Sequence, residues 1–283
     1  MGFKDVLVHL DGSRRVADRL AYAIEWAVRD GAHLTGLFTL DLVPTLAELA
    51  RAYPGRIERF ETFIEMRARE VARAKEVEAH FRSAVQRAEV SGEWRFVEWP
   101  SAETVAIQAR YADLTIVGQV DPDNPGVGTA ATIPEETLFA SGRPLVIVPY
   151  AGQFPSIGRR IVVGWKPTRE AARALADALP ILERAAEVTV LTINPDRGPD
   201  TEPGVAGADI ALHLARHGVR AEARTTIADD VATGDVLLNE VADRGADLLV
   251  MGGYGHARLR ETMFGGVTRH VLESMTVPVL MAH

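Results

Sequence analysis

The stretch from residue 247 to residue 278, DLLVMGGYGHARLRETMFGGVTRHVLESMTVP, is the part of the chain on which the fold assignment depends. An apolar run at its start predicts a buried strand, and a helical pattern follows the glycines Gly252, Gly255, Gly265 and Gly266. Glycines between a strand and a helix let the backbone approach a ligand closely, and the free N–H groups at a helix start attract phosphate. A glycine-rich turn that only links a strand to a helix has the same spacing, so both interpretations remain open.

The glycine spacing also resembles a known loop. Gly-x-x-Gly, nine residues and Gly265, followed by a small residue, Val267-Thr268, a helix and a Val-Pro-Val strand, is similar to the ATP-binding loop of the universal stress protein family. The resemblance implies a nucleotide-binding loop made of Gly252, Gly255, His256, Gly265, Gly266, Val267 and Thr268. Nucleotide-binding members usually have Ser or Thr where this chain has Gly266, so one hydroxyl group to phosphate is missing although the backbone N–H remains. His256 is either a phosphate contact or a solvated loop residue.

Composition is typical of a globular protein of two ordinary domains. The chain has 283 residues, of which 47% are hydrophobic and 25% charged, and it has no cysteine, which fits a reducing compartment. The formal charge of −8 opposes binding to nucleic acid or to an anionic membrane surface. The first residues lack the features of a signal peptide, and no apolar run approaches membrane-spanning length. We therefore expect a cytoplasmic protein.

Apolar runs and helical patterns alternate along the first half of the chain. Strands are expected at residues 3–10, 33–41, 94–99, 114–120 and 144–149, and helices at 14–30 and 103–111, with one long helix or a pair of helices at 55–90. Ser13 is the expected N-cap of the first helix, whose apolar residues recur at Val16, Leu20, Ile24 and Val28. This alternation predicts an α/β fold with a mainly parallel sheet.

The second half repeats the first. Aligning Val8 on Val163 gives an offset of 155 residues, and aligning Asp113 on Asp247 gives an offset of 134, with no gaps around either anchor. The first copy is thus 21 residues longer, where the long helical stretch 55–90 lies. We expect a first domain at residues 1–150, a linker at 151–158 and a second domain at 159–283. The resemblance implies two tandem universal stress domains with a Rossmann-like fold of the adenine nucleotide alpha hydrolase type, each a five-stranded, mainly parallel sheet flanked by helices.

The repeat allows the two implied sites to be compared. In the family an acidic residue after the first strand contacts the nucleoside, and this position is Asp11 in the first copy. Gly252 falls on Gly118, but Gly255 falls on Asp121, which would place negative charge beside phosphate. The last two loop glycines fall on Ala131 and Thr132. The first domain is therefore a degenerate counterpart, marked by Asp11, Gly118 and Asp121, and we expect it to bind no ATP.

In the second copy Lys166 stands in the place of the acid. Lys166 either reaches the phosphates as a point charge or pairs with a surface acid. Trp165 either packs on a base or covers the sheet edge, and Asn194 lies about where family members touch the adenine.

Other motifs give less support. Gly126-Val-Gly-Thr-Ala-Ala131 matches a dinucleotide fingerprint but follows a proline-containing loop instead of a strand, and no P-loop or Gly-x-Ser-x-Gly motif occurs. His213 and His217 have the spacing of two metal ligands, but no third ligand is evident, and His217 also suits a helix C-terminus.

The strands at 144–149 and 278–282 would lie at sheet edges. In the family this strand pairs across a dimer, so the resemblance implies a homodimer or an internal pseudo-dimer of the two copies.

These observations predict a stress-response protein with a site for ATP or a related adenine nucleotide, with or without magnesium, in its C-terminal domain. We expect binding and at most slow ATP hydrolysis, because no base for water can be named. The alternative is a scaffold that binds no nucleotide and acts through its dimer surface and its long helix. An enzyme on the same fold has the least support, because fold alone does not give function.

Overall fold

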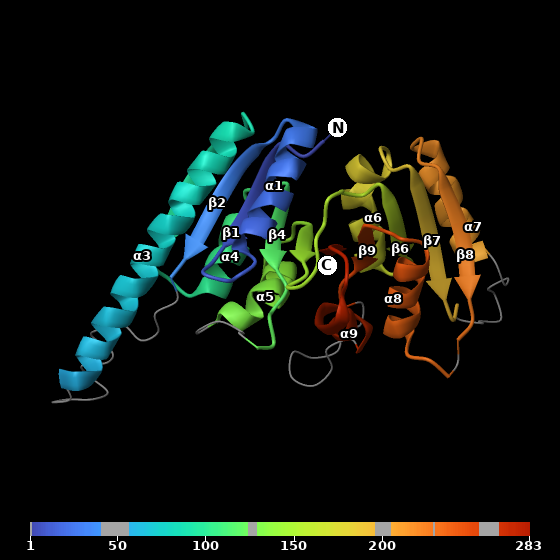
Figure 1. The fold of residues 1–283 in the computed structure, drawn as a ribbon. Helices are drawn as coiled ribbons and strands as arrows, with labels where there is room; N and C mark the ends of the chain where they lie inside the picture. Colours follow the sequence, from blue (N-terminus) through green and yellow to red (C-terminus); the bar gives the residue numbers. More distant parts are fainter. Residues whose placement is uncertain (1, 41–56, 124–128, 196–204, 229, 255–265) are drawn as a thin grey trace. The chain divides into compact units, whose positions relative to one another are not determined.

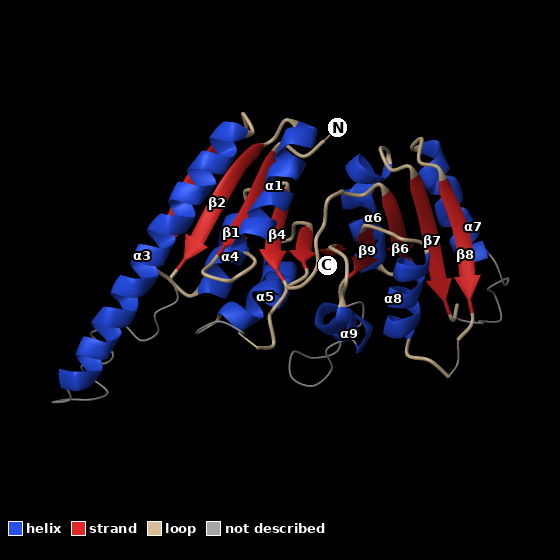
Figure 2. Ribbon diagram, viewed as in Figure 1, coloured by secondary structure: helices blue, strands red, loops and turns tan. Residues whose placement is uncertain are grey.

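The computed structural model describes residues 2–40, 57–123, 129–195, 205–228, 230–254 and 266–283. Its contacts divide the chain into two compact units, one made of Lys4–Ser141 and the other of Gly142–His283 with Met1–Phe3. In both units strands and helices alternate, as the sequence predicts, and the helices lie against the strands (Figures 1 and 2). The predicted α/β class with a mostly parallel sheet is therefore confirmed.

The first unit has four described parallel strands in the order β3-β2-β1-β4. Its elements are β1 (Asp5–Leu10), α1 (Val16–Asp30), β2 (His33–Thr39), α3 (Ile57–Arg87), β3 (Gly92–Val97), α4 (Ser101–Ala109), β4 (Leu114–Gly118), the 3-10 turn η1 (Ala130–Thr132) and α5 (Ile133–Ala140). The strand order reverses between β1 and β4, because the chain builds outward from β1 to β3 and then crosses to the other side.

The second unit has the same arrangement with two more strands, in the order β5-β10-β9-β6-β7-β8. Its elements are β5 (Leu145–Val148), β6 (Arg160–Gly164), α6 (Arg169–Leu182), β7 (Glu187–Ile193), α7 (Val205–Arg216), β8 (Ala221–Thr226), α8 (Thr233–Asp243), β9 (Leu248–Gly252), α9 (Gly266–Ser274) and β10 (Val279–Ala282). All pairs are parallel except β5 with β10, which are antiparallel with Val146 opposite Leu280.

The β5–β10 pair confirms that the fifth strands of the two copies pair with each other. The structure groups residues 142–150 with the second unit, whereas the sequence analysis assigns them to the first domain. The boundaries 1–150, 151–158 and 159–283 stay a prediction.

The C-terminal part of α3 packs into the core of the first unit. The side chains of Ala74, Val77, Phe81 and Val85 are buried in its C-terminal part, and the Phe81 ring lies 5.6 Å from that of Trp94 on β3. Gly36 on β2 makes this possible, because a Cβ there would stand 2.8 Å from the Phe81 ring. The apolar residues Ile64 and Met66 lie nearer the start of α3 and are exposed.

The sequence analysis predicted only part of the buried face of the first helix correctly. In α1 the side chains of Leu20, Tyr22 and Trp26 are buried, whereas Val28 is 57% exposed. Ser13 is not the N-cap either, because Arg15 holds that position and no side chain caps the helix. The Ser13 hydroxyl instead accepts a hydrogen bond from Arg19. Among the helices that the structure describes, none combines the length and the apolar character needed to cross a membrane.

Candidate functional site

The carboxyl ends of β6 and β9 form the edge at which the predicted site of the second unit lies. These strands are neighbours, with Gly164 opposite Met251. In the strand order, the chain continues from β6 to β7 on one side of this pair and from β9 to β10 on the other. Ligands of open α/β sheets bind in the crevice at such a reversal of strand order. Trp165 follows β6 and Gly252 ends β9, so the structure brings these two predicted residues to one edge.

Gly252 has a packing role that is visible in the structure. A Cβ at this position would lie 2.5 Å from the backbone nitrogen of Ala171 and 2.7 Å from the backbone carbon of Glu170. The first turn of α6 therefore rests directly on the end of β9, and only glycine leaves room for it. This close approach fixes the N-terminus of α6 at the edge.

The turn between β6 and α6 is held by backbone and cap hydrogen bonds. The Trp165 N–H donates to the carbonyl of Leu191 over 2.8 Å, and the Thr168 hydroxyl caps α6 by accepting from the Ala171 N–H over 3.3 Å. Lys166 is exposed at this turn, and no ion pair of its ammonium group occurs within the described part of the chain.

Glu170 is a buried carboxylate beside that turn, and the sequence analysis does not single it out. Burial would raise the pKa of Glu170, but hydrogen bonds from Arg169, from its own backbone N–H and from Thr168 bring the pKa below its ordinary value. The Arg169 side chain forms the ion pair. Glu170 thus stays ionised at the helix start, where the helix dipole also favours a negative charge.

The start of α9 is tied to the end of β9. The backbone N–H of Tyr254 donates to the hydroxyl of Thr268 over 3.0 Å, and Tyr254 has a φ of 54°, a backbone conformation that side-chain-bearing residues rarely adopt. Thr268 is buried, so its hydroxyl fixes the Tyr254 backbone instead of facing solvent. Gly266 is exposed at the first position of α9, and no described atom would lie within 4 Å of a Cβ there. The first N–H groups of a helix have no partner within the helix, so those of Gly266 and Val267 are candidates to bind a ligand.

The residues Gly255, His256 and Gly265 lie outside the described residues. Their assignment to the loop stays a prediction.

Asn194 uses its side chain for the strands themselves. Its Nδ2 group donates to the Ala228 carbonyl over 2.9 Å, and its Oδ1 atom accepts from the Ala228 N–H over 2.8 Å. Asn194 has a φ of 45°, which Asn tolerates better than most residues. The amide therefore closes the ends of β7 and β8, and its predicted contact with adenine would require one of these bonds to be exchanged.

The corresponding edge of the first unit, at the ends of β1 and β4, is filled by its own side chains. Arg19 of α1 is 4% exposed and forms an ion pair with Asp11 at 2.6 Å. A Cβ at Gly118 would overlap the Arg19 guanidinium, and one at Gly12 would overlap the side chain of Arg73 from α3. Arg19 thus pairs with Asp11 and fills the space beside Gly118, and Arg73 fills the space beside Gly12; the sequence analysis did not identify either arginine.

The electrostatics of this edge follow from burial and from Arg19. Burial alone would raise the pKa of Asp11, but Arg19, His9 and the hydrogen bonds with Ser13 bring this pKa below its ordinary value. Burial lowers the pKa of His9 from 6.5 to about 4. The negative charge of Asp11 raises this pKa, and the positive charge of Arg19 lowers it further. The neutral His9 ring lies 3.0 Å from the Thr39 hydroxyl, which donates in turn to Ser101 over 2.8 Å.

Asp121, the predicted repulsive charge of the first unit, accepts a hydrogen bond from the Asp123 N–H over 2.9 Å. It therefore closes a local turn after β4.

The amino-end edges of the two units are alike. In the first unit Asp113 accepts hydrogen bonds from the N–H groups of Lys4 and Asp5, at 2.8 and 3.1 Å. In the second unit Asp247 accepts from the N–H groups of Arg159 and Arg160, at 3.0 and 2.9 Å. The sequence offsets of 134 and 155 residues relate these acceptors and donors, so the repeat preserves this contact between equivalent residues.

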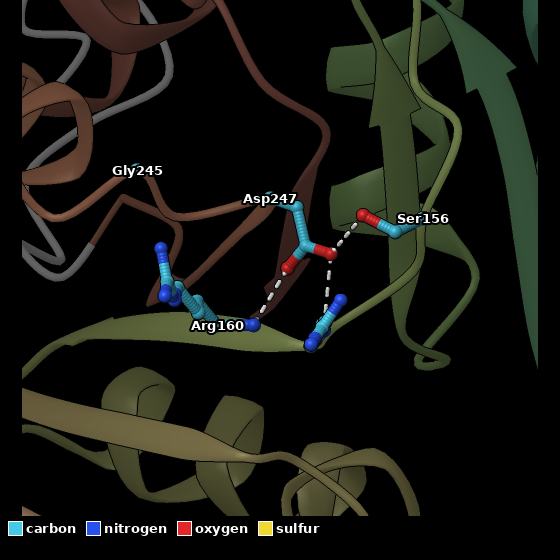
Figure 3. Close-up of a pocket in the computed structure, with 5 residues that line it drawn as sticks. Ser156, Arg160, Gly245 and Asp247 are labelled. Atoms are coloured by element: carbon cyan, nitrogen blue, oxygen red, sulfur yellow. Dashed lines mark hydrogen bonds between the residues drawn. The ribbon is translucent and has the colours of Figure 1, made fainter.

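The Asp247 contact lies beside a small hollow. Figure 3 shows the carboxylate between Arg160 and Ser156, whose hydroxyl is a third donor at 2.5 Å. The hollow has a volume of about 200 Å³ and is lined by Ser156, Arg159, Arg160, Gly245 and Asp247. Because Asp247 is already bound by three donors from the start of β6, we interpret this feature as a clamp that holds the strand.

Comparison with known proteins identifies the second unit. Residues 158–283 match the model of the universal stress protein family. The whole chain resembles a universal stress protein from Archaeoglobus fulgidus, with a TM-score of 0.72 and 16% identity, over 98% of this chain and 96% of that one. A similar match is a putative universal stress protein from Pseudomonas aeruginosa, with a TM-score of 0.61 and 16% identity, over 98% of this chain and 92% of that one. No curated protein matches the chain. At this identity the structural matches establish the fold, and the family model establishes the relationship of the second unit.

Proposed function

Because residues 158–283 match the model of the universal stress protein family, we propose that this chain is a stress-response protein that binds ATP or a related adenine nucleotide with its second unit. One observation carries the proposal. Gly266 is exposed at the first position of α9 with no described atom near the place of a Cβ, and the Tyr254–Thr268 hydrogen bond ties the start of α9 to the end of β9. A helix N-terminus beside a reversal of strand order is suited to phosphate.

The charges at this edge support a phosphate-bearing ligand. Lys166 is exposed on the adjoining turn, and the acid that would occupy its position in the family is absent. In this proposal the N–H groups of Gly266 and Val267 donate to phosphate oxygens, and Lys166 supplies a cation. Trp165, at the same turn, is the residue that would lie against the nucleoside. Asn194 has the weakest support, because both polar atoms of its amide bind Ala228.

Binding, and not turnover, is the purpose that we assign to this site. The described residues at the edge include no group that is placed to take a proton from water, since the Glu170 carboxylate is buried against Arg169. Magnesium would accompany the nucleotide as a phosphate complex. We further propose that the protein works in the cytoplasm, in keeping with the lack of cysteine, and that it acts as a homodimer or through the internal pairing of its fifth strands.

A matched pair of variants tests the proposal. Gly266→Asp places a carboxylate at the exposed start of α9, and Thr132→Asp places one at the equivalent exposed position of the first unit. We expect calorimetric titration with ATP, with and without magnesium, to show saturable binding that Gly266→Asp weakens at least about tenfold, since the new charge repels phosphate. Thr132→Asp should bind as the unaltered protein does.

The outcomes separate the candidate functions. Absence of saturable binding in the unaltered protein, or equal binding by both variants, would leave the scaffold function that involves no nucleotide. Formation of ADP above the level of the Gly266→Asp variant would contradict the assignment of binding without turnover.

A further inference from the structure

A pair of histidines at the end of α7 forms a feature that the nucleotide site does not use. His213 lies in the last turn of α7, and His217 follows one turn later. Their ring centroids are 4.8 Å apart, with the ring planes inclined at 56°. Both side chains are exposed, so both rings face solvent on the same side of the helix (Figure 1 locates α7).

The backbone under this pair is fixed by a regular helix end. The Val219 N–H donates to the Leu214 carbonyl and the Gly218 N–H to the Ala215 carbonyl, both over 3.0 Å, and Gly218 has a φ of 78°. These two bonds and the left-handed glycine define a Schellman motif with His217 at the C-cap. The side chains of Leu214 and Val219 are buried, which anchors the turn to the unit. The backbone that carries the two rings is therefore held in place before any ligand binds.

The surroundings suit a cation. Within the described residues neither imidazole forms a hydrogen bond or an ion pair with another side chain. The last carbonyl groups of α7 give this end a partial negative charge, which favours a positive ion. Asp209 lies one further turn back on the same face, while Arg216 is the nearby positive charge. No group of three or more His, Cys, Asp or Glu side chains that could hold a metal occurs in the described chain, so the pair would bind with two protein ligands.

We propose that His213 and His217 chelate a divalent transition-metal ion at the end of α7, separately from the nucleotide edge. Two imidazole nitrogens one helical turn apart are an established chelating arrangement, and imidazole suits Cu²⁺, Ni²⁺ and Zn²⁺. Water fills the remaining coordination positions. The order of affinities for first-row ions places Cu²⁺ above Ni²⁺ and Zn²⁺, so Cu²⁺ is the tightest-binding probe.

The test is a Cu²⁺ titration of the full chain in the presence of glycine as a weak competing ligand. It is followed by calorimetry and by electron paramagnetic resonance. We expect one ion to bind with a two-nitrogen imidazole signature. His213→Asn and His217→Asn should each lower the affinity for Cu²⁺ at least about tenfold, because each removes one of the two imidazole ligands. His80→Asn, which removes an exposed histidine of α3, is the matched control and should leave the affinity unchanged.

Two results would overturn the proposal. One is Cu²⁺ binding by His213→Asn with the affinity of the unaltered chain, and the other is the absence of any saturable Cu²⁺ binding when glycine competes. Circular dichroism of each variant checks that the fold is unaltered, which is expected since both side chains are exposed. A thermal midpoint that rises with Cu²⁺ in the unaltered chain but not in His217→Asn would give independent support.

Discussion

The two units share their strand order but differ in what lies at the carboxyl ends of their central strands. In the first unit Arg19 and Arg73 cover the glycines Gly118 and Gly12, and Arg19 neutralises Asp11. In the second unit the equivalent edge presents Lys166 and Gly266, both of them exposed in the described part of the chain. At the amino ends, by contrast, Asp113 and Asp247 make the same backbone contacts.

This contrast separates structural from functional residues within one chain. A contact that both copies keep with equivalent residues, such as the aspartate clamp, serves the fold. The carboxyl ends of the central strands differ between the copies, and such a region is where a ligand site is gained or lost. This difference supports our proposal that the ligand binds to the second unit and that the side chains at the corresponding place in the first unit have a structural role.

The largest expected effect distinguishes the two glycines that the repeat aligns. Gly252→Ala should lower the free energy of unfolding by about 3 kcal/mol or more, because the new methyl group meets the backbone of α6, which cannot move aside. Gly118→Ala should cost less, about 1 kcal/mol, because its methyl group meets the end of the long Arg19 side chain, which can shift more readily than helix backbone. Urea unfolding followed by circular dichroism measures both, and equal losses would contradict the different packing of the two edges.

The pH dependence of stability tests the closed edge of the first unit. His9 has a pKa of about 4 in the folded protein against 6.5 in the unfolded chain, so between these values the unfolded chain binds more protons. The contribution of His9 is complete above pH 6.5 and should fall by up to about 3 kcal/mol as the pH drops toward 4. Asp11, whose pKa is lowered by folding, adds a loss only at more acidic pH.

Replacing His9 isolates its part of this dependence. His9→Gln should flatten the change in the urea midpoint between pH 6.5 and 4, while His80→Gln, at an exposed position, should not. The same slope in all three proteins would show that His9 is not the titrating group.

Replacing either clamp aspartate, Asp113 or Asp247, should lower stability and leave ATP affinity unchanged. Asp247→Ala should destabilise by about 2 kcal/mol, because three donors lose an ionised acceptor. Asp113→Ala should cost somewhat less, because it removes two bonds. Neither variant should alter ATP affinity by more than about twofold, since both lie at the amino-end edges. Urea unfolding and ATP titration measure the two effects, and a large loss of affinity in Asp247→Ala would place function at the clamp.

The smallest effect concerns the hydroxyl group that the loop lacks. Gly266→Ser should raise the affinity for ATP about fivefold, because the side chain has free space and can donate to a phosphate oxygen. Gly266→Ala, which fills the same space without a donor, is the control and should give no gain. An equal affinity for Ser and Ala at this position would argue that phosphate does not lie beside Gly266.

Much of the fold could be predicted from the sequence, because buried parallel strands are continuous apolar runs and the two copies confirm each other's pattern. The buried face of α1 could not be predicted, because spacing alone does not tell which of several apolar rows packs on the sheet. Trp26 is buried, whereas Val28 is exposed. Arg19 was missed because a charged side chain in a helix is expected in solvent, and only its pairing with Asp11 across the edge allows it to be buried.

The candidate site was predictable to a similar degree. The sequence placed Gly252 and Trp165 in one site, and the structure puts both at the carboxyl ends of the neighbouring strands β9 and β6, although their role in binding stays a prediction. The packing reason for Gly252 was hidden, because α6 contacts it from a distant part of the chain. The hydrogen bonds that occupy Asn194 and Thr268 were equally hidden, since their partners Ala228 and Tyr254 lie on other segments.

Hydrogen–deuterium exchange, recorded by mass spectrometry with and without saturating ATP, tests the central claim most directly because it reads both edges in one sample. The account predicts that ATP slows exchange at the start of α9 and in the turn from Trp165 to Thr168. The turn from Asp11 to Arg15 and the region around Thr132 should stay unchanged. Protection of the first unit's turn, or no ATP-dependent change at the start of α9, would contradict the assignment of the ligand to the second unit.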